Sequence, residues 1–181
     1  MQLEMKQILK SLEARQTLNI TLAIAKLAVQ SKSNLDELVE SFIKTKSPMK
    51  ERIAWCISHC FDLDSNCLNP YLPVLSDIYM DKKNHQAVDR NLSRIFSLVK
   101  PKGEPWEEIV IDKSFKIIYA NDYPIATVCN AMLAIYNLGT NHHEILHELG
   151  IYIQSKIIDE KPAFKTRGNY IIGELRKKKL A

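Results

Sequence analysis

The sequence predicts an all-α protein in which pairs of short helices stack into a right-handed superhelix. Apolar residues recur at helical spacing along nearly all of the 181 residues, as they do where one face of each helix is buried. The interruptions carry residues that begin and end helices, and a weak repeat of constant length runs along the chain. With five glycines and few β-branched runs, the chain holds little material for β-hairpins.

Each apolar stripe predicts one helix, so about nine or ten helices are expected. The stripes cover residues 18–29, 35–43, 53–60, 72–79, 88–99, 109–119, 128–135, 146–157 and 171–175. The most apolar of them, 18–29, is interrupted by Asn19, Thr21 and Lys26 and is too short to span a bilayer. It is therefore expected to be a buried helix, and no contact with a membrane is expected.

The breaks between the stripes contain typical helix-terminating and helix-initiating residues. They are Ser33-Asn34, Ser47-Pro48, Asn69-Pro70, the segment 101–105, Tyr123-Pro124, the segment 139–141 and Lys161-Pro162. Proline is tolerated in the first turn of a helix because its missing N–H has no intrahelical partner there. The connections are short, which favours helices that pack against their neighbours in the chain.

The helices repeat with a period of 39 residues. Asn91, Asn130 and Asn169 are spaced by this interval (130 − 91 and 169 − 130), and Arg52 lies one interval earlier (91 − 52). A helix, a turn and a second helix of this size are typical of HEAT or armadillo repeats, in which each pair buries its apolar stripe against the next pair. We expect a single domain over residues 1–181, with units at 10–47, 48–83, 84–121 and 122–160 and a C-terminal cap at 161–181.

Composition favours a protein of the reducing cytoplasm. The four cysteines show no regular framework, and the first ten residues lack the apolar segment of a secretory leader. The net charge of +4 permits an acidic partner but is too small to indicate nucleic acid by itself.

Several segments resemble a family of small bacterial HEAT-like proteins. They are RIAWCISHC (52–60), LNPYLPVL (68–75), AVDRNLSRIF (87–96), ATVCNAMLAIYNLG (126–139) and AFKTRGNYIIGEL (163–175). The resemblance spans roughly residues 48–175 and implies the helical-repeat fold. Members often carry the label adenylosuccinate lyase, so that activity is one hypothesis. True lyases use a Ser-Ser-x-Met-Pro-x-Lys loop, whereas this chain has no Ser-Ser pair, and in Ser47-Pro48-Met49-Lys50 the proline precedes the methionine.

One segment matches a zinc-peptidase pattern. His143-Glu144-Ile145-Leu146-His147 places two imidazoles one helical turn apart, and an intervening glutamate can activate a zinc-bound water. A third protein ligand is required, but the extended motif would place it at Ile153. Zinc-dependent hydrolysis therefore stays a second enzymatic hypothesis. The favoured interpretation is an ordinary helix with both histidines at its solvent border.

The basic residues allow two interpretations. Arg52, Arg90, Arg94 and Arg167 lie near the starts of predicted first helices, where pairing with neighbours is favoured over a basic ridge. Arg176, Lys177, Lys178 and Lys179 suit the last turn of a helix, but such clusters also contact phosphates. Nucleic-acid binding is therefore an alternative function.

The favoured function is a non-catalytic scaffold that binds another protein through the concave face of the repeat array. No catalytic residue, metal ligand or cofactor is assigned. In such arrays the second helices are expected to line that face. The candidate partner-binding residues are Asp77, Lys113, Lys116, His143 and His147.

Overall fold

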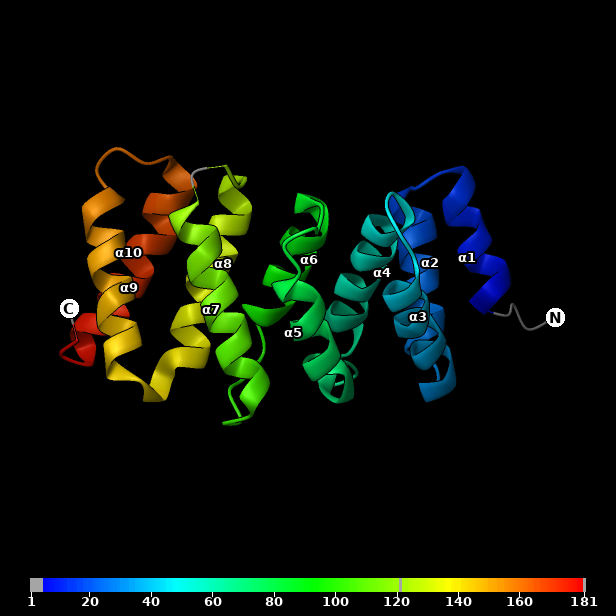
Figure 1. The fold of residues 1–181 in the computed structure, drawn as a ribbon, viewed down its shortest axis with the longest axis horizontal. Helices are drawn as coiled ribbons and strands as arrows, with labels where there is room; N and C mark the ends of the chain where they lie inside the picture. Colours follow the sequence, from blue (N-terminus) through cyan, green and yellow to red (C-terminus); the bar gives the residue numbers. More distant parts are fainter. Residues whose placement is uncertain (1–4, 121, 181) are drawn as a thin grey trace. The chain divides into compact units, whose positions relative to one another are not determined.

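A computed structural model describes residues 5–120 and 122–180, and over these residues the protein is all-helical with no strand. The first helices are α1 (Met5–Ala14), α2 (Leu18–Ala28), α3 (Lys32–Lys44), α4 (Met49–Leu63), α5 (Leu72–Met80) and α6 (Gln86–Phe96). They are followed by α7 (Pro105–Tyr119), α8 (Ile125–Leu138), α9 (His143–Lys156) and α10 (Pro162–Lys177) (Figure 1). Two short 3₁₀ helices, η1 (Asn69–Tyr71) and η2 (Gly139–Asn141), precede α5 and α9. The all-α prediction is confirmed.

The helices begin where local chemistry favours it. Thr17 and Ser31 cap α2 and α3, because each hydroxyl accepts a hydrogen bond from the backbone N–H three residues later. Proline is the first residue of α7 and α10. The buried carboxylate of Glu107 accepts a hydrogen bond from the N–H of Glu104 at 3.3 Å, which satisfies one unpaired donor at the start of α7. The prolines and serines thus mark helix starts as predicted, except that α3 begins at Lys32, before the Ser33-Asn34 break.

Helix α1 is absent from the sequence prediction. Its buried side chains are Met5, Leu9 and Leu12, which are four and three residues apart and so share one face. The helical spacing of these three apolar residues is visible in the sequence. The stripe is short, however, and charged residues flank it, so it did not stand out as a predicted helix.

The described chain divides into two compact units. Unit 1 contains residues 5–78 and 82–92, and unit 2 contains residues 79–81, 93–120 and 122–180. The single-domain prediction and its repeat boundaries stay predictions, and residues 121 and 181, which end two of the expected units, lie outside the described residues.

Unit 1 is built around α4. This helix packs against α1, α2 and α3, and its face of Ile53, Cys56, Ile57 and Cys60 is buried. All four cysteines of the chain are free thiols. Burial raises the pKa of Cys56 to about 12, so at neutral pH this thiol is protonated and packs as a small apolar group. The apolar stripe of residues 53–60, which predicted a helix with one buried face, is therefore buried as expected.

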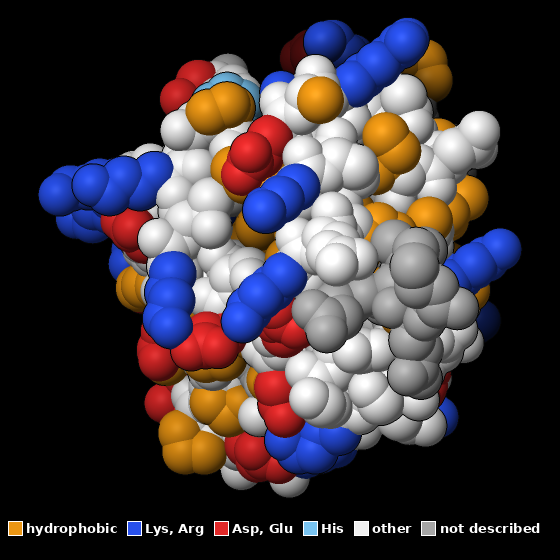
Figure 2. Space-filling model, turned by 90° about the vertical axis from the view of Figure 1, so that its right-hand side faces the viewer, with side chains coloured by type: hydrophobic (Ala, Val, Ile, Leu, Met, Phe, Trp, Pro, Cys, Tyr) orange, Lys and Arg blue, Asp and Glu red, His pale blue; other side chains and the backbone are white. Residues whose placement is uncertain are grey.

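The α1 end of unit 1 shows a surface of mixed charge. Figure 2 shows lysine and arginine side chains interspersed with acidic ones on this face. Lys32 pairs with Asp36 and Lys44 with Glu40, each one helical turn apart. This arrangement is typical of a solvated helix surface.

Unit 2 is built around α8, which packs against α7, α9 and α10. Its buried residues run from Thr127 to Leu138 on nearly every side of the helix. Helix α10 also packs against α9, and Gly168 allows the close approach because a Cβ there would lie 2.8 Å from Cγ2 of Ile153. Among the described residues, no helix is both long and apolar enough to cross a membrane.

Substituting Gly168→Ala is expected to lower the free energy of unfolding by about 1–3 kcal/mol. The new methyl would lie 2.8 Å from Ile153 Cγ2 and 3.3 Å from Ile157 Cδ1, and Cγ2 can move only if Ile153 changes rotamer. Gly173→Ala in the same helix is the matched control, because nothing lies within 4 Å of its Cβ position. There alanine is expected to stabilise by about 0.5–1 kcal/mol. Urea unfolding of both variants distinguishes the effects, and equal shifts would contradict the close packing of α9 and α10.

Candidate functional site

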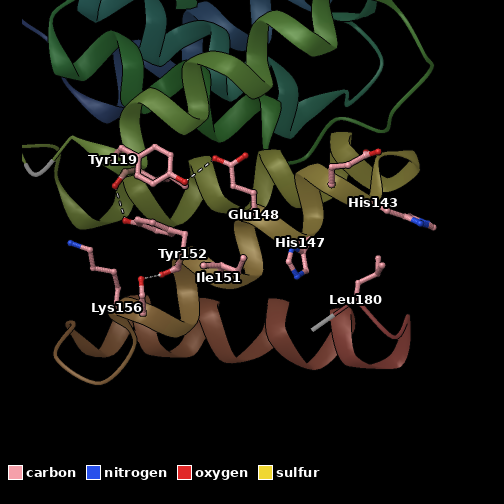
Figure 3. A pocket seen from close by; sticks show the side chains of 11 residues that line it. Tyr119, His143, His147, Glu148, Ile151, Tyr152, Lys156 and Leu180 are labelled. Atoms are coloured by element: carbon pink, nitrogen blue, oxygen red, sulfur yellow. Dashed lines mark hydrogen bonds between the residues drawn. The ribbon is translucent and has the colours of Figure 1, made fainter.

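A groove of roughly 690 Å³ runs along the exposed side of α9 in unit 2. We call it the α9 groove. It is lined by Ile118 and Tyr119 of α7, by Leu180, and by His143, Glu144, His147, Glu148, Ile151, Tyr152, Ser155 and Lys156 of α9 (Figure 3). Its volume is within the range of sites that hold a small ligand or the anchor side chains of a protein partner.

The sequence of α9 explains why these side chains share one side. His143, His147 and Ile151 are spaced by one helical turn, as are Glu144 and Glu148. Leu146, Leu149 and Ile153 lie on the opposite side and are fully buried. The helix therefore buries one stripe in the core and presents the other to the groove.

Two tyrosines connect α9 to α7. The hydroxyl of Tyr152 donates to the carbonyl oxygen of Ile118 at 2.7 Å, near the end of α7 where that carbonyl lacks an intrahelical partner. The ring of Tyr119 meets that of Tyr152 edge-on, with the centroids 5.3 Å apart and the planes at 88°. The hydroxyl of Tyr119 donates to Oε1 of Glu148 at 2.9 Å (Figure 3).

The environment keeps both phenols protonated. Burial raises the pKa of Tyr152 to about 12. Burial also raises the pKa of Tyr119, and the hydrogen bond to Glu148 adds to that effect. At neutral pH the two hydroxyls therefore act as donors and hold Glu148 and the α7 terminus in place.

The last turn of α10 places Leu180 in the groove. Lys179 has a φ of 60°, and the N–H of Leu180 donates to the carbonyl of Leu175 at 2.9 Å. This is the left-handed turn that commonly ends a helix and returns the following apolar residue to the helix. Leu180 thus lines the groove together with Ile151, although the two are far apart in the sequence.

Two of the large hydrophobic side chains that line the α9 groove are exposed to solvent, although such side chains are usually buried. Ile151 is 56% exposed and Tyr119 is 53% exposed. Glu144, His143, His147 and Lys156 are exposed around them. An apolar centre with a polar rim is the composition of a protein-binding surface.

Two of the five predicted partner-binding residues line the α9 groove. His143 and His147 lie on α9 as predicted, and both line the α9 groove. Lys116 is exposed on α7 but outside the groove, and its Nζ lies 2.6 Å from Oδ2 of Asp112. Asp77 is exposed on α5 in unit 1.

Lys113 requires a correction. It was expected on a polar surface, but it is only 5% exposed, and its Nζ lies over the ring of Tyr79 at 5.7 Å from the centroid. A lysine has a long apolar stem that can pack in a core while its ammonium group contacts an aromatic face. Lys113 is therefore not part of a candidate contact surface.

The groove does not supply the ligands of a catalytic zinc. Within residues 5–120 and 122–180, no group of three or more His, Cys, Asp or Glu side chains is placed to hold a metal ion. Ile153, at the third ligand position of the extended motif, is fully buried. On α10, an oxygen of Glu174 lies 2.6 Å from Nζ of Lys177, so this carboxylate is paired with a lysine.

Two of the four basic residues at the C-terminus make intramolecular contacts. Lys177 pairs with Glu174, and Nζ of Lys178 lies over the ring of Tyr136 at 5.0 Å from its centroid. Arg176 and Lys177 are in the last turn of α10, where positive charge offsets the negative end of the helix dipole.

The sequence analysis did not identify Tyr119, Ile151, Tyr152 and Leu180 as site residues. Tyr119 was assigned to the end of a core stripe, and nothing local showed that its ring lies against Tyr152. The available signal was the apolar Ile151 on the polar side of α9, between His147 and Ser155. Comparisons with protein-family models, curated proteins and solved structures found no match to this chain.

Tyr152→Phe is expected to lower the free energy of unfolding by about 1–2 kcal/mol, because the Ile118 carbonyl loses its partner in a buried setting. Tyr119→Phe removes a solvent-exposed hydrogen bond to the Glu148 carboxylate and is expected to cost less than about 0.5 kcal/mol. Chemical denaturation of the two variants provides the comparison. Equal losses would contradict the role of Tyr152 as the connection between α7 and α9.

Stability is expected to fall between about pH 10 and about pH 12. The pKa of Tyr152 is about 12 in the folded protein, and an unfolded tyrosine has a pKa of about 10. Below the lower value both states are protonated and the stabilisation is complete; above it the unfolded state releases its proton first, so unfolding becomes easier as pH rises. In Tyr152→Phe this decrease should be smaller, and a tyrosinate absorbance titration should lack one late-titrating phenol. An unchanged titration would contradict the burial of this hydroxyl.

Proposed function

We propose that this chain is a HEAT-like scaffold that binds a partner protein in the α9 groove. The observation that carries the proposal is the exposed apolar centre of Ile151 and Tyr119 within a polar rim, held on rigid helices. The partner would insert apolar or aromatic side chains beside Ile151 and Leu180, as in complexes where a helix or extended segment occupies a hydrophobic groove.

The helix order supports the repeat part of the proposal. Each of the expected units 48–83, 84–121 and 122–160 contains one consecutive pair, α4 with α5, α6 with α7 and α8 with α9. Arg52, Asn91, Asn130 and Asn169 lie on α4, α6, α8 and α10, which are alternate helices. A right-handed superhelix is the arrangement we propose for these pairs. The four free thiols support a reducing compartment such as the cytoplasm.

The other candidate functions have less support. Zinc hydrolysis would need a third ligand where Ile153 is buried. Adenylosuccinate cleavage would need positioned acid and base groups, and no residue of the chain carries the lyase loop signature. For nucleic-acid binding, Lys177 and Lys178 already contact Glu174 and Tyr136.

Ile151→Asp is expected to weaken partner binding, because a carboxylate at the centre of the groove would lose the apolar contacts of Ile151 and would be desolvated in the complex. Affinity capture from cells that express the protein would identify the partner, and the affinity of the purified pair would then be measured. We expect Ile151→Asp to weaken binding by at least about tenfold, as for a central anchor residue.

Ile158→Asp is the matched control. Ile158 is 79% exposed and follows α9, but it does not line the groove. Its substitution is expected to leave the affinity unchanged. The proposal fails if both variants bind alike, or if the captured species is nucleic acid that dissociates steeply with added salt.

A further inference from the structure

A second groove lies on another side of unit 2, between the first turns of α8 and α10. We call it the α8–α10 groove; its volume is roughly 640 Å³. Asn130 and Cys129 of α8 and Arg167 and Tyr170 of α10 line it. It shares no residue with the α9 groove, so an inference about it does not rest on the proposed function.

Small side chains create the space. Ala126 of α8 and Ala163 of α10 line the groove, and each is exposed. Elsewhere α8 and α10 pack together. Because these two side chains are only methyl groups, the helices leave a gap between them. Asn130 of α8 and Arg167 and Tyr170 of α10, which lie about one turn or more further along, line the rest of the groove.

Two strong hydrogen-bonding groups in this groove have no partner in the described protein. The guanidinium of Arg167 and the side-chain amide of Asn130 make no hydrogen bond or ion pair there. Both are only partly exposed. Both groups therefore remain available as donors to an external acceptor that enters the groove.

The residues that lie two and one repeat intervals before Asn130, Arg52 and Asn91, behave differently. Arg52 of α4 donates to the carbonyl oxygens of Leu12 and Glu13. Asn91 of α6, one repeat interval before Asn130, donates through Nδ2 to the carbonyl of Ala87 at 2.8 Å. The amide at this position is therefore engaged within the protein in α6 but left available in α8.

The groove is partly apolar. Arg167 is the charged residue of its lining, and among the described residues no acidic side chain lines it. Burial raises the pKa of the Cys129 thiol, and the positive charge of Arg167 opposes that shift while Glu160 adds to it. The charge of Arg167 is thus felt within the groove. Tyr170 is 52% exposed and offers an aromatic ring beside the guanidinium.

We propose that the α8–α10 groove binds a small monocarboxylate with a flat apolar body. The guanidinium of Arg167 donates two parallel hydrogen bonds to the carboxylate, and the Asn130 amide donates a third. The apolar body packs against the ring of Tyr170 and the surface of Ala126 and Ala163. One guanidinium balances one carboxylate, whereas a phosphate dianion would keep an uncompensated charge in a groove with apolar walls.

The test measures binding of phenylacetate by ligand-observed NMR and by titration of backbone amide shifts of the full chain. Saturable binding is expected, with shifts around Asn130, Arg167 and Tyr170. Phenylacetamide, the neutral isostere, and phenylphosphonate, the dianionic analogue, are expected to bind at least about tenfold more weakly, the change that corresponds to loss of one charge-assisted hydrogen bond.

Arg167→Met retains much of the side-chain volume but removes the charge, and it should weaken phenylacetate binding by at least about tenfold. Arg167→Lys should retain part of the affinity, because it keeps the charge but loses the bidentate geometry. Lys165→Met is the matched control, since Lys165 is on the same helix but outside the groove, and it should bind as the unsubstituted protein does. Unchanged melting temperatures would verify that the variants fold.

Several outcomes would overturn the inference. One is the absence of saturable binding, and another is equal binding of phenylacetate and phenylacetamide. Tighter binding of phenylphosphonate would replace the carboxylate assignment with a phosphate site. Equal losses in Arg167→Met and Lys165→Met would reveal non-specific attraction to positive charge.

Discussion

The arrangement of unit 2 depends on the burial of α8. This helix carries no charged residue and packs against three others. Because α7, α9 and α10 each bury an apolar stripe against α8, their opposite sides face outward in a defined orientation. The hydrophobic effect at this one helix therefore determines which side of α9 and which side of α10 remain available to other molecules.

Side-chain size then decides where these outward sides open into grooves. Between α7 and α9 the space is held by two tyrosines, whose rings meet edge-on and whose hydroxyls bind Ile118 and Glu148. Between the first turns of α8 and α10 the small side chains of Ala126 and Ala163 leave a groove. Where α10 meets α9, Gly168 permits direct contact with Ile153. Packing of helices thus gives three results in unit 2. The contact of α10 with α9 is close, the space between α7 and α9 is a groove with tyrosines in its wall, and the space between α8 and α10 is a groove lined by small side chains.

The two grooves differ in chemistry and suit different occupants. The α9 groove has exposed apolar residues at its centre and both signs of charge around them, which favours protein side chains. The α8–α10 groove has one unpaired guanidinium and one unpaired amide, which favours a single carboxylate. Under the two proposals, a partner protein would occupy the α9 groove and a small molecule the α8–α10 groove, and the two grooves share no lining residue.

The sequence by itself determined the all-helical class, most helix positions and the faces on which Cys56, Cys60, His143 and His147 lie, because these features follow from local spacing and from proline and serine at helix ends. Only the tertiary structure decided that Tyr119 lies against Tyr152, that Leu180 returns to α9, that Lys113 is buried, and that Arg167 and Asn130 share a groove without partners. These facts depend on which helices meet and at what distance. Such contacts join residues from different helices, and the spacing within one helix contains no information about its neighbour.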